Sequence, residues 1–283
     1  MHEHSGAGHR LEWEGETMLL SGQVVAITGS AVGIGRALAM ACAAEGADLA
    51  LLDIDAPANL ETAHAVRASG RRALALDCDI ADAGQVRTAF ARILDELGRV
   101  DVLFNNAAVY IDTSLTRGTF ASQSEGYARS IEICALGGYY CTLAAVPSMR
   151  TNGGGNVINL ITEHIKEGHM MAGLGSSGYD AAKWVQWRQT ESWAVELEPY
   201  GIRVNALGPG ATDTPMLRAV SVPHAEKGMK PEDVALAALN VLRQGPKGPT
   251  GQTYIFGISG QPREVGRREA EAILTRREGD RIP

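Results

Sequence analysis

The sequence predicts an α/β fold: one domain built on a doubly wound parallel sheet of about seven strands, with helices on both faces. Short apolar runs alternate with longer helical stretches along nearly the whole chain. The apolar runs are continuous rather than alternating with polar residues, which is typical of strands covered on both faces. Composition agrees, because 45% of the 283 residues are hydrophobic and 21% are charged, as in ordinary globular proteins.

Seven short runs rich in β-branched and other apolar residues are expected to form the strands. They lie at 24–28, 47–53, 72–77, 100–105, 156–161, 202–207 and 252–256. The stretches between them are helical in composition: the first is Ala-rich, and the second has Pro57 near its start, where proline is tolerated. Helices are expected at 33–45, 57–69, 82–97, 124–149, 179–197 and 231–242.

No break in composition divides the chain, so we expect a single domain over 21–260. A polar N-terminal tail covers 1–20, and a charge-rich C-terminal extension covers 261–283. The extension is expected to be helical. Its charge favours a solvated tail helix, and the alternative is a cap over the site of a neighbouring subunit.

Charge and hydropathy exclude several classes of function. The net charge of −7 argues against a nucleic-acid or anionic-membrane partner, and no apolar run approaches the roughly 20 residues of a membrane span. The first residues are acidic and polar, unlike a secretory signal. The four cysteines show no paired spacing, which predicts reduced thiols in a cytoplasmic protein.

A glycine-rich turn follows the first strand and opens the first helix. Gly29 allows a sharp turn, Gly33 allows backbone to approach a pyrophosphate, and Gly35 allows the helix to pack close to the strand. The helix N-terminus then offers free N–H groups to the phosphates, with Ala31 and Ile34 lining the same turn. A glycine cluster can serve a turn alone, but its place between a strand and a helix favours a dinucleotide site of the Rossmann type.

An acidic residue ends the second strand. Asp53 follows Gly35 at close to the spacing of about 20 residues that is typical of a ribose-binding carboxylate, and Ile54 beside it is expected to line the cofactor site. The carboxylate would accept hydrogen bonds from both ribose hydroxyls and repel a 2′-phosphate. No Lys or Arg stands at 30–32, so the sequence predicts NAD rather than NADP. The alternative is that Asp53 only starts a solvated loop.

A tyrosine and a lysine lie four residues apart within a predicted helix. Tyr179 and Lys183 therefore share one helix face. Hydride transfer to a ketone needs a proton donor at the oxygen, and alcohol oxidation needs the corresponding base. Free tyrosine titrates near about 10, so an adjacent ammonium and an oxidised nicotinamide are expected to lower its pKa.

Seven motifs occur together in a fixed order. They are T-G-x-x-x-G-I-G at 28–35, C-D-I at 78–80, N-N-A at 105–107, V-I-N-L with a hydroxyl residue at 157–162, Y-x-x-x-K at 179–183, R-V-N-A at 203–206 and P-G-x-x-x-T-P at 209–215. In this order and spacing the chain resembles the short-chain dehydrogenase/reductase family, classical subfamily, over about residues 20–260. The resemblance implies a Rossmann-type oxidoreductase that requires no metal.

The resemblance also implies roles for further residues. Asp79 would bind the adenine amino group with Ile80 beside the ring, Asn105 and Ala107 would line the cofactor ribose, and Lys183 would bind the nicotinamide ribose. The nicotinamide carboxamide would be enclosed by Pro209, Gly210, Thr212 and Thr214. Two alternatives stay open: Asn105 as a strand-end cap, and Pro209-Gly210 as a turn only.

The chain departs from the family pattern at two catalytic positions. Thr162 stands where the family usually has Ser; it keeps the hydroxyl that would bind the substrate oxygen but adds a methyl group. Cys134 stands where a helix-borne Asn supports a proton relay, and a thiol is a poor hydrogen-bond partner. We expect Cys134 to be a buried structural thiol, with Gly137-Gly138 preserving part of the local helix distortion.

The segment between Thr162 and Tyr179 is expected to form a wall of the substrate pocket. Its candidate residues are Glu163, His164 and Met170, although His164 could instead face solvent. The lid segment between residues 214 and 231 looks short for the family, which suggests an open or differently covered site.

The predicted function is reversible hydride transfer between NAD and a small secondary alcohol or ketone, with Tyr179, Lys183 and Thr162 as the catalytic residues. The main alternative is a catalytically weak protein of the same fold that binds NAD as a sensor or scaffold. An extended-branch sugar-nucleotide epimerase or dehydratase is disfavoured, because no substantial C-terminal substrate domain is present. The resemblance also implies a homo-oligomer, a dimer or tetramer, with Trp184, Trp187 and Trp193 in its interface or core.

Overall fold

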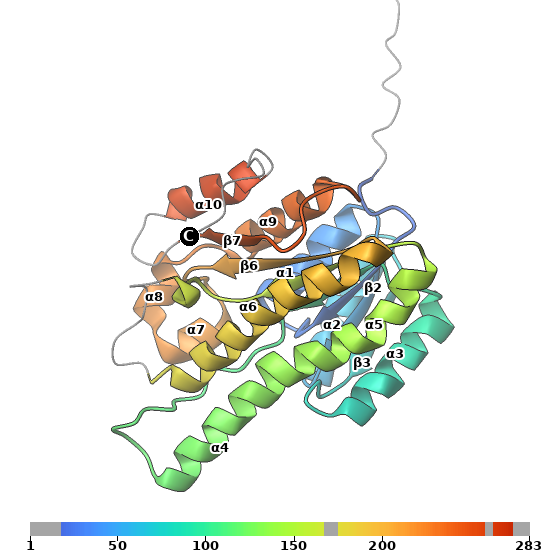
Figure 1. The fold of residues 1–283 in the computed structure, drawn as a ribbon. Coiled ribbons are helices and arrows are strands. Elements are labelled where there is room, and N and C mark those ends of the chain that lie inside the picture. The colour runs from blue at the N-terminus through green and yellow to red at the C-terminus, as the bar shows by residue number, and fades with distance from the viewer. Residues whose placement is uncertain (1–17, 167–174, 258–262, 274–283) are drawn as a thin grey trace, which may run out of the picture.

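The computed structural model describes residues 18–166, 175–257 and 263–273, and it contains one seven-stranded sheet (Figure 1). All neighbouring strands pair in parallel, in the order β3-β2-β1-β4-β5-β6-β7. The strands are β1 (Val24–Thr28), β2 (Asp48–Asp53), β3 (Ala73–Asp77), β4 (Val102–Asn105), β5 (Gly155–Leu160), β6 (Ile202–Pro209) and β7 (Thr253–Phe256). The predicted doubly wound parallel sheet is therefore confirmed.

Helices connect the strands as expected, and they add short elements that the sequence did not reveal. The α-helices are α1 (Gly33–Ala44), α2 (Ala56–Ala68), α3 (Ala83–Leu97), α4 (Phe120–Ile131), α5 (Gly138–Thr151), α6 (Ser177–Leu197), α7 (Pro215–Val220), α8 (Val222–Lys227), α9 (Pro231–Arg243) and α10 (Arg263–Ala272). A π-helical segment, η1 (Glu132–Gly137), joins α4 to α5, and the 3₁₀ turns η2 (Glu163–Ile165) and η3 (Glu198–Tyr200) flank α6. Over the described ranges, none of these helices has both the length and the apolar character to cross a bilayer.

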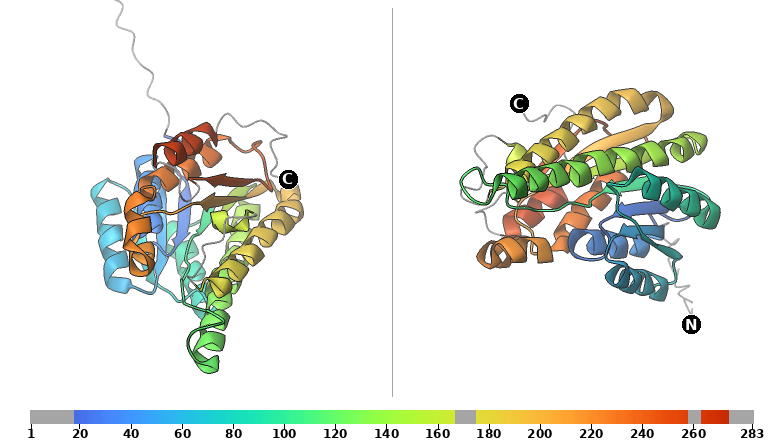
Figure 2. Two further views of the ribbon diagram at one scale, coloured as in Figure 1. Left: turned by 90° about the vertical axis from the view of Figure 1, so that its left-hand side faces the viewer. Right: turned by 90° about the horizontal axis from the view of Figure 1, so that it is seen from below.

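Two helix layers sandwich the sheet (Figure 2). Alternate residues of β1 show how both faces are used: Val25 and Ile27 pack with α1 and α9, whereas Val24 and Ala26 pack with α3 and α5. Every residue of β1 is buried. Because both faces are covered, the strands need continuous apolar runs, which is the pattern that identified them in the sequence.

The strand order reverses between β1 and β4. β1 pairs with β2 on one side and with β4 on the other, so the connections after these strands run to opposite faces of the sheet. In open α/β sheets this switch point leaves a crevice at the carboxyl ends of the strands. The glycine-rich turn after β1 lies at this point.

The C-terminal helix α10 differs from its expectation as a solvated tail. Ala270 and Ile273 are buried in the core cluster with α9, and the backbone carbonyl of Ala270 accepts a hydrogen bond of 3.0 Å from the Asn240 amide. Figure 1 shows α10 lying along α9 beside the sheet. The described part of the extension therefore belongs to the core, because its few apolar residues lie on one face of the helix.

All four cysteines lie among the described residues, and each is buried and free. Burial raises the pKa of the Cys42 thiol to about 12 and that of Cys78 to about 11. These groups therefore stay protonated near neutral pH, as expected for structural thiols.

Candidate active site

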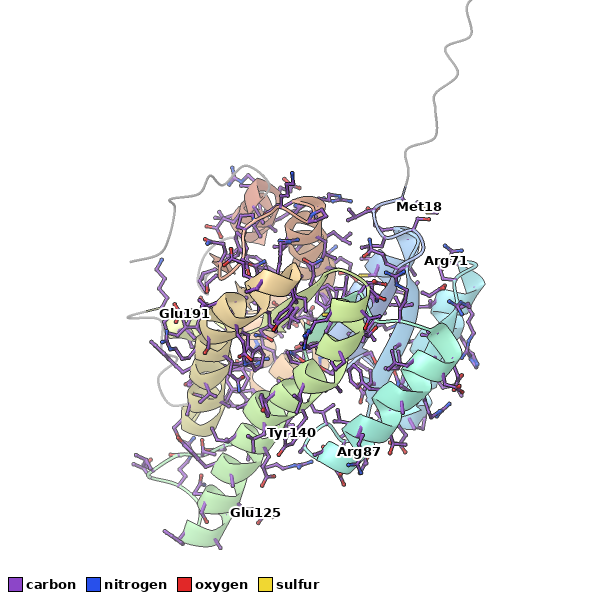
Figure 3. All side chains as sticks on the ribbon, turned by 45° about the vertical axis from the view of Figure 1, so that its right-hand side comes forward. Met18, Arg71, Arg87, Glu125, Tyr140 and Glu191 are labelled. Carbon is purple, nitrogen blue, oxygen red and sulfur yellow. The ribbon has the colours of Figure 1, made fainter. Side chains whose placement is uncertain are left out.

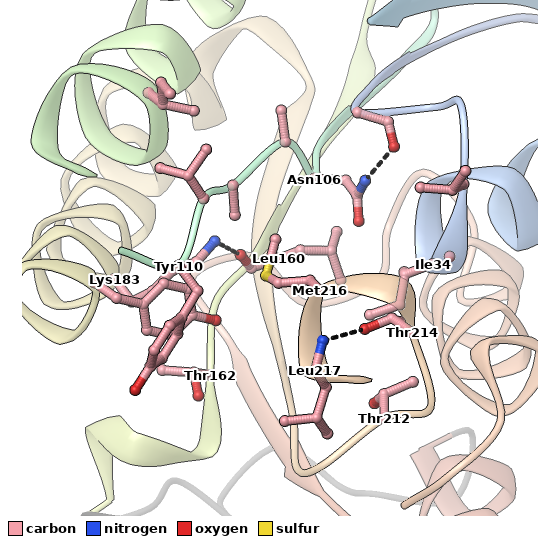
Figure 4. Close-up of a pocket in the computed structure, with 18 of the residues that line it drawn as sticks. Ile34, Asn106, Tyr110, Leu160, Thr162, Lys183, Thr212, Thr214, Met216 and Leu217 are labelled. Carbon is pink, nitrogen blue, oxygen red and sulfur yellow. Dashed lines mark hydrogen bonds between the residues drawn. The ribbon is translucent and has the colours of Figure 1, made fainter. Parts of the chain in front are cut away.

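A pocket of about 360 Å³ opens at the carboxyl ends of the central strands (Figure 4). Most of the predicted site residues line it: Gly29, Gly33, Ile34, Asp53, Ile54, Asp79, Ile80, Ala107, Thr162, Glu163, His164, Tyr179, Lys183, Pro209, Gly210, Thr212 and Thr214. Three predicted cofactor residues, Ala31, Gly35 and Asn105, are not among its lining residues. Met170 lies outside the described residues.

The glycine turn is fixed by the end of β4. The Asn106 amide donates hydrogen bonds of 2.9 Å to the carbonyl oxygens of both Thr28 and Gly29. Gly29 and Gly33 have φ values of +67° and +58°, which only glycine adopts readily. A Cβ atom at Gly35 would collide with the carbonyl group of Gly29, so Gly35 serves helix–strand packing behind the pocket, as the sequence argument expected.

The N-terminus of α1 suits a phosphate group. Among the described residues, no side chain caps this terminus, and its first turn carries no acidic residue. Gly33 and Ile34, at the start of the helix, line the pocket. Uncapped N–H groups and the positive end of the helix dipole favour an anion here, so the turn fits the pyrophosphate of a dinucleotide.

The Asp53 carboxylate is held at the same end of the pocket by two backbone groups. It accepts hydrogen bonds of 2.9 Å from the N–H groups of Ala31 and Asp55. The Ala31 N–H is therefore used within the protein, and Ala31 is buried beside the pocket rather than lining it. Asp53 is half-buried and presents its negative charge where the adenosine ribose is expected.

Asp79 lies in the pocket but has a partner that the sequence did not reveal. Its carboxylate forms an ion pair of 2.5 Å with Arg129 of α4 and accepts a 3.0 Å hydrogen bond from the Ala81 N–H. Arg129 also lines the pocket. No sequence signal connects the two residues, because they lie 50 positions apart.

Asn105 does not face the pocket, which corrects the expectation that it lines the cofactor ribose. Its side-chain amide donates hydrogen bonds of 2.9 Å to Thr142 and Asn159, and the residue is 2% exposed. Asn105 thus ties β4 to β5 and α5 behind the pocket wall. The next residue, Asn106, lines the pocket instead.

The catalytic candidates Tyr179, Lys183 and Thr162 come together at the other end of the pocket. Tyr179 and Lys183 lie on α6 one turn apart, and the Lys183 Nζ is 5.8 Å from the centre of the Tyr179 ring. The Thr162 hydroxyl lies close enough to the Tyr179 phenol to lower the pKa of that phenol. Nζ donates a 2.5 Å hydrogen bond to the carbonyl oxygen of Leu160, at the end of β5 (Figure 4).

Burial dominates the proton affinity of this pair. Burial raises the pKa of Tyr179, with smaller contributions in the same direction from Cys134 and Asp180, whereas the nearby Thr162 hydroxyl lowers it. Burial also lowers the pKa of Lys183. The sequence led us to expect a lowered pKa for Tyr179, caused in part by the positive charge of an oxidised nicotinamide. That lowering remains an expectation for the cofactor-bound enzyme.

Cys134 lies within the π-helical segment and is buried, at 1% exposure. It is close enough to Tyr179 and Lys183 to contribute to the electrostatics of both. The helix distortion expected from Gly137-Gly138 is present as η1. Such π-helical turns occur mostly inside longer helices and often at functional sites.

His164 is buried rather than solvent-facing. Its Nδ1 lies 2.7 Å from a carboxylate oxygen of Asp180, and the other oxygen of Asp180 accepts a 2.5 Å hydrogen bond from the Ser176 hydroxyl. The His164 ring meets the Tyr179 ring edge-on, with their centres 6.4 Å apart. Asp180 and Tyr110, whose ring centre lies 5.4 Å from that of Tyr179, were not predicted from the sequence.

The lid segment between β6 and α9 covers part of the pocket. Thr214 caps α7 by accepting a 3.2 Å hydrogen bond from the Leu217 N–H. Met216, Leu217 and Val220 of α7 line the pocket, and Figure 4 shows Met216 and Leu217 on the lid. An apolar lid therefore lies across from the polar wall of Thr162 and His164.

Comparison with known proteins agrees with this geometry. The model of the short chain dehydrogenase family matches residues 23–224. An uncharacterised oxidoreductase of Schizosaccharomyces pombe is 32% identical over 87% of this chain and 94% of its own. Sorbitol dehydrogenase of Cereibacter sphaeroides is 36% identical over 69% of this chain and 73% of its own.

Solved structures give the same result. A 7α-hydroxysteroid dehydrogenase in complex with NADH and 7-oxo glycochenodeoxycholic acid matches with a TM-score of 0.77 and 25% identity, over 88% of this chain and 98% of its own. The chain therefore belongs to the short-chain dehydrogenase/reductase family. Proteins of this family are oxidoreductases that transfer hydride with a nicotinamide cofactor, act on small molecules and typically form oligomers.

Proposed function

We propose that this chain is an NAD-dependent enzyme that transfers hydride reversibly between a secondary alcohol or ketone and the nicotinamide. One observation carries the proposal. The Thr162 hydroxyl, the Tyr179 phenol and the Lys183 ammonium meet at one end of a pocket whose other end carries the glycine turn and Asp53. Proton transfer and dinucleotide binding are thus supported within one continuous cavity.

The residues at the catalytic end have distinct tasks. Tyr179 donates a proton to the ketone oxygen or, as phenolate, accepts one from the alcohol. Thr162 hydrogen-bonds the same substrate oxygen and orients it, and Lys183 keeps a positive charge near the phenol and holds the nicotinamide ribose. When bound, the nicotinamide supplies or accepts the hydride.

The proposed cofactor contacts follow the pocket from the adenosine end. They involve the turn with Gly29, Gly33 and Ile34, then Asp53, Ile54, Asp79, Ile80 and Ala107, and finally Pro209, Gly210, Thr212 and Thr214. We propose NAD rather than NADP, because the Asp53 carboxylate repels a 2′-phosphate. Ala31 and Gly35 contribute by shaping the turn.

The substrate contacts are proposed from the wall beside Tyr179. Glu163 and His164 are buried and line the pocket. Because the Nδ1 of His164 faces Asp180, its Nε2 is the ring nitrogen left for a polar group of the substrate. Sorbitol dehydrogenase and 7α-hydroxysteroid dehydrogenase, which this chain resembles, are both named for alcohols, which supports a substrate of this class.

Replacing the phenol tests the proposed function. Tyr179→Phe should lower turnover by about 100-fold or more and leave the Kd for NADH within a few-fold of the wild-type value. Tyr200→Phe is the matched control, because Tyr200 is 43% exposed and lies outside the pocket. A panel of secondary alcohols with NAD reduction as readout gives the rates. Retained turnover in Tyr179→Phe would rule out the assigned role.

The sensor or scaffold alternative rests on Thr162 and Cys134, the two departures from the family pattern. It predicts NADH binding with no turnover of any alcohol or ketone in such a panel. The Lys183 ammonium, which is buried beside the Tyr179 ring, favours the enzyme, since burying a charge is costly and a binding protein has no need of it.

We also propose a homo-oligomer in the cytoplasm. Large apolar side chains are exposed on α4, α5, α6 and the segment between α4 and α5, which lie side by side in Figure 3: Tyr127, Leu136, Tyr139, Leu143, Trp184, Val185 and Val195. A patch of this kind favours a subunit interface. Trp193, in contrast, is buried in the core. The cytoplasmic location rests on the four free cysteines.

A further inference from the structure

A glutamine on α6 contacts the catalytic lysine directly. The Gln186 Oε1 accepts a 3.0 Å hydrogen bond from the Lys183 Nζ, and its Nε2 donates a 3.2 Å hydrogen bond to the carbonyl oxygen of Asn105. Gln186 is 1% exposed. The orientation of the amide is determined by its partners, because reversing it would place NH₂ against an ammonium and oxygen against a carbonyl.

The Lys183 ammonium depends on few acceptors. Within the described ranges it forms no ion pair with a carboxylate, and its hydrogen bonds go to the Leu160 carbonyl and to Gln186. Burial disfavours its charged form, whereas hydrogen bonds accepted from the ammonium favour that form. Gln186 therefore supplies one of the two contacts that offset the burial of this charge.

Further hydrogen bonds tie the backbone of Gln186 to the neighbouring strands. Its backbone carbonyl accepts a 3.0 Å hydrogen bond from the Thr190 hydroxyl, which in turn accepts a 2.8 Å hydrogen bond from Asn159. Asn159 is bonded to Asn105. Lys183 is thus connected through Gln186 to the carboxyl ends of β4 and β5, where the pocket begins.

We propose that Gln186 is a positioning residue of the catalytic pair: it keeps the Lys183 ammonium charged and aimed, and so sets the pH range in which Tyr179 exchanges its proton. The inference rests on the proposed function of Tyr179 and Lys183. The other titratable groups around the phenol are Tyr110, Cys134, His164 and Asp180, and none of them contacts Gln186 directly among the described residues.

The sign of the effect follows from charge. Without the Gln186 acceptor, Lys183 loses its proton more readily, and the loss of positive charge beside Tyr179 makes its phenolate less favourable. Alcohol oxidation needs the phenolate, so the acidic limb of its pH profile should move to higher pH. One hydrogen bond to a charged group corresponds to a shift of about one pH unit and about a tenfold lower rate on that limb.

Three variants test the proposal by the pH dependence of kcat/KM for alcohol oxidation. Gln186→Leu removes both hydrogen bonds and should move the acidic limb to higher pH. Gln186→Met keeps the length of the side chain but replaces the amide with a thioether, which is only a weak acceptor, so its acidic limb should also move to higher pH. Gln189→Leu is the matched control: Gln189 lies on the same helix, and its amide donates to the Ala135 carbonyl instead.

NADH affinity and Tm, measured on the same samples, separate positioning from structure. An unshifted limb in Gln186→Leu, or an equal shift in Gln189→Leu, overturns the proposal. If Gln186→Leu does not fold, Gln186→Met decides: an unshifted acidic limb in this variant overturns it. A wild-type profile in Gln186→Leu, together with an inactive Tyr179→Phe, would refute this inference and leave the proposed function intact.

Discussion

Replacing Asp53 with Asn tests the assignment of NAD with little change in shape. The Asp53 carboxylate accepts two backbone hydrogen bonds, from the N–H groups of Ala31 and Asp55, each of 2.9 Å. An asparagine keeps one oxygen acceptor and removes the negative charge, whereas an alanine would lose both acceptors. The variant Asp53→Asn therefore isolates the electrostatic part of cofactor choice.

The size of the effect follows from the burial of Asp53. The residue is half-buried, so the effective dielectric constant there lies between those of water and of a protein surface site. Two unit charges about 5 Å apart repel each other by about 1 to 3 kcal/mol over that range, which is a factor of about 5 to 150 in affinity. We expect the preference for NAD over NADP to fall by about 10-fold or more in Asp53→Asn.

The assay compares kcat/KM for NAD and for NADP with one alcohol, in wild type, Asp53→Asn and Asp55→Asn. Asp55 is the control because its carboxylate is exposed, caps α2 through the Ala58 N–H and does not line the pocket. Both variants lose the same charge, two residues apart. The reasoning fails if Asp53→Asn keeps the wild-type preference, or if Asp55→Asn changes it equally.

Four further predictions concern the catalytic end and the turn. Thr162→Val should lower kcat by about 10- to 100-fold, and Thr162→Ser only a few-fold, because serine keeps the hydroxyl; equal losses would contradict the role of the hydroxyl. Gly35→Ala should lower Tm by several degrees, because its methyl group meets the carbonyl of Gly29; an unchanged melting curve would argue against the close packing. Burial raises the pKa of Tyr179, so oxidation, which needs the phenolate, should speed up as pH rises, while reduction, which needs the phenol, should slow; parallel profiles would exclude Tyr179 as the shared group. Cys134→Asn should give equal or higher turnover, and complete loss would show that the position is misassigned.

Features that depend on neighbouring residues along the chain were predictable. A run of five apolar or β-branched residues predicts the strand β1, and all five are buried. The turn after it needs glycine for local reasons, as the positive φ values of Gly29 and Gly33 show. Tyr179 and Lys183 share a face because of helical spacing alone.

Features that depend on pairing between distant segments were not predictable from pattern. Asn105 and Asn106 are adjacent and chemically identical, yet Asn105 is the buried last residue of β4 and only Asn106, which follows the strand, lines the pocket. Arg129 reaches Asp79 across 50 positions, and His164 reaches Asp180 from a different element. Sequence patterns can suggest that such residues are functional, but they do not show which distant residues contact them.

The helix distortion around Cys134 does not require the asparagine that the family usually carries there. Gly137 lies against Ile80, where a Cβ atom would be only 2.7 Å from the isoleucine side chain, and so close packing of a glycine favours the π-helical turn at this point. The Lys183 ammonium donates its hydrogen bonds to other groups, namely the Leu160 carbonyl and the Gln186 side chain. The presence of a thiol at Cys134 in place of an amide is therefore a weak argument for a catalytically inactive protein.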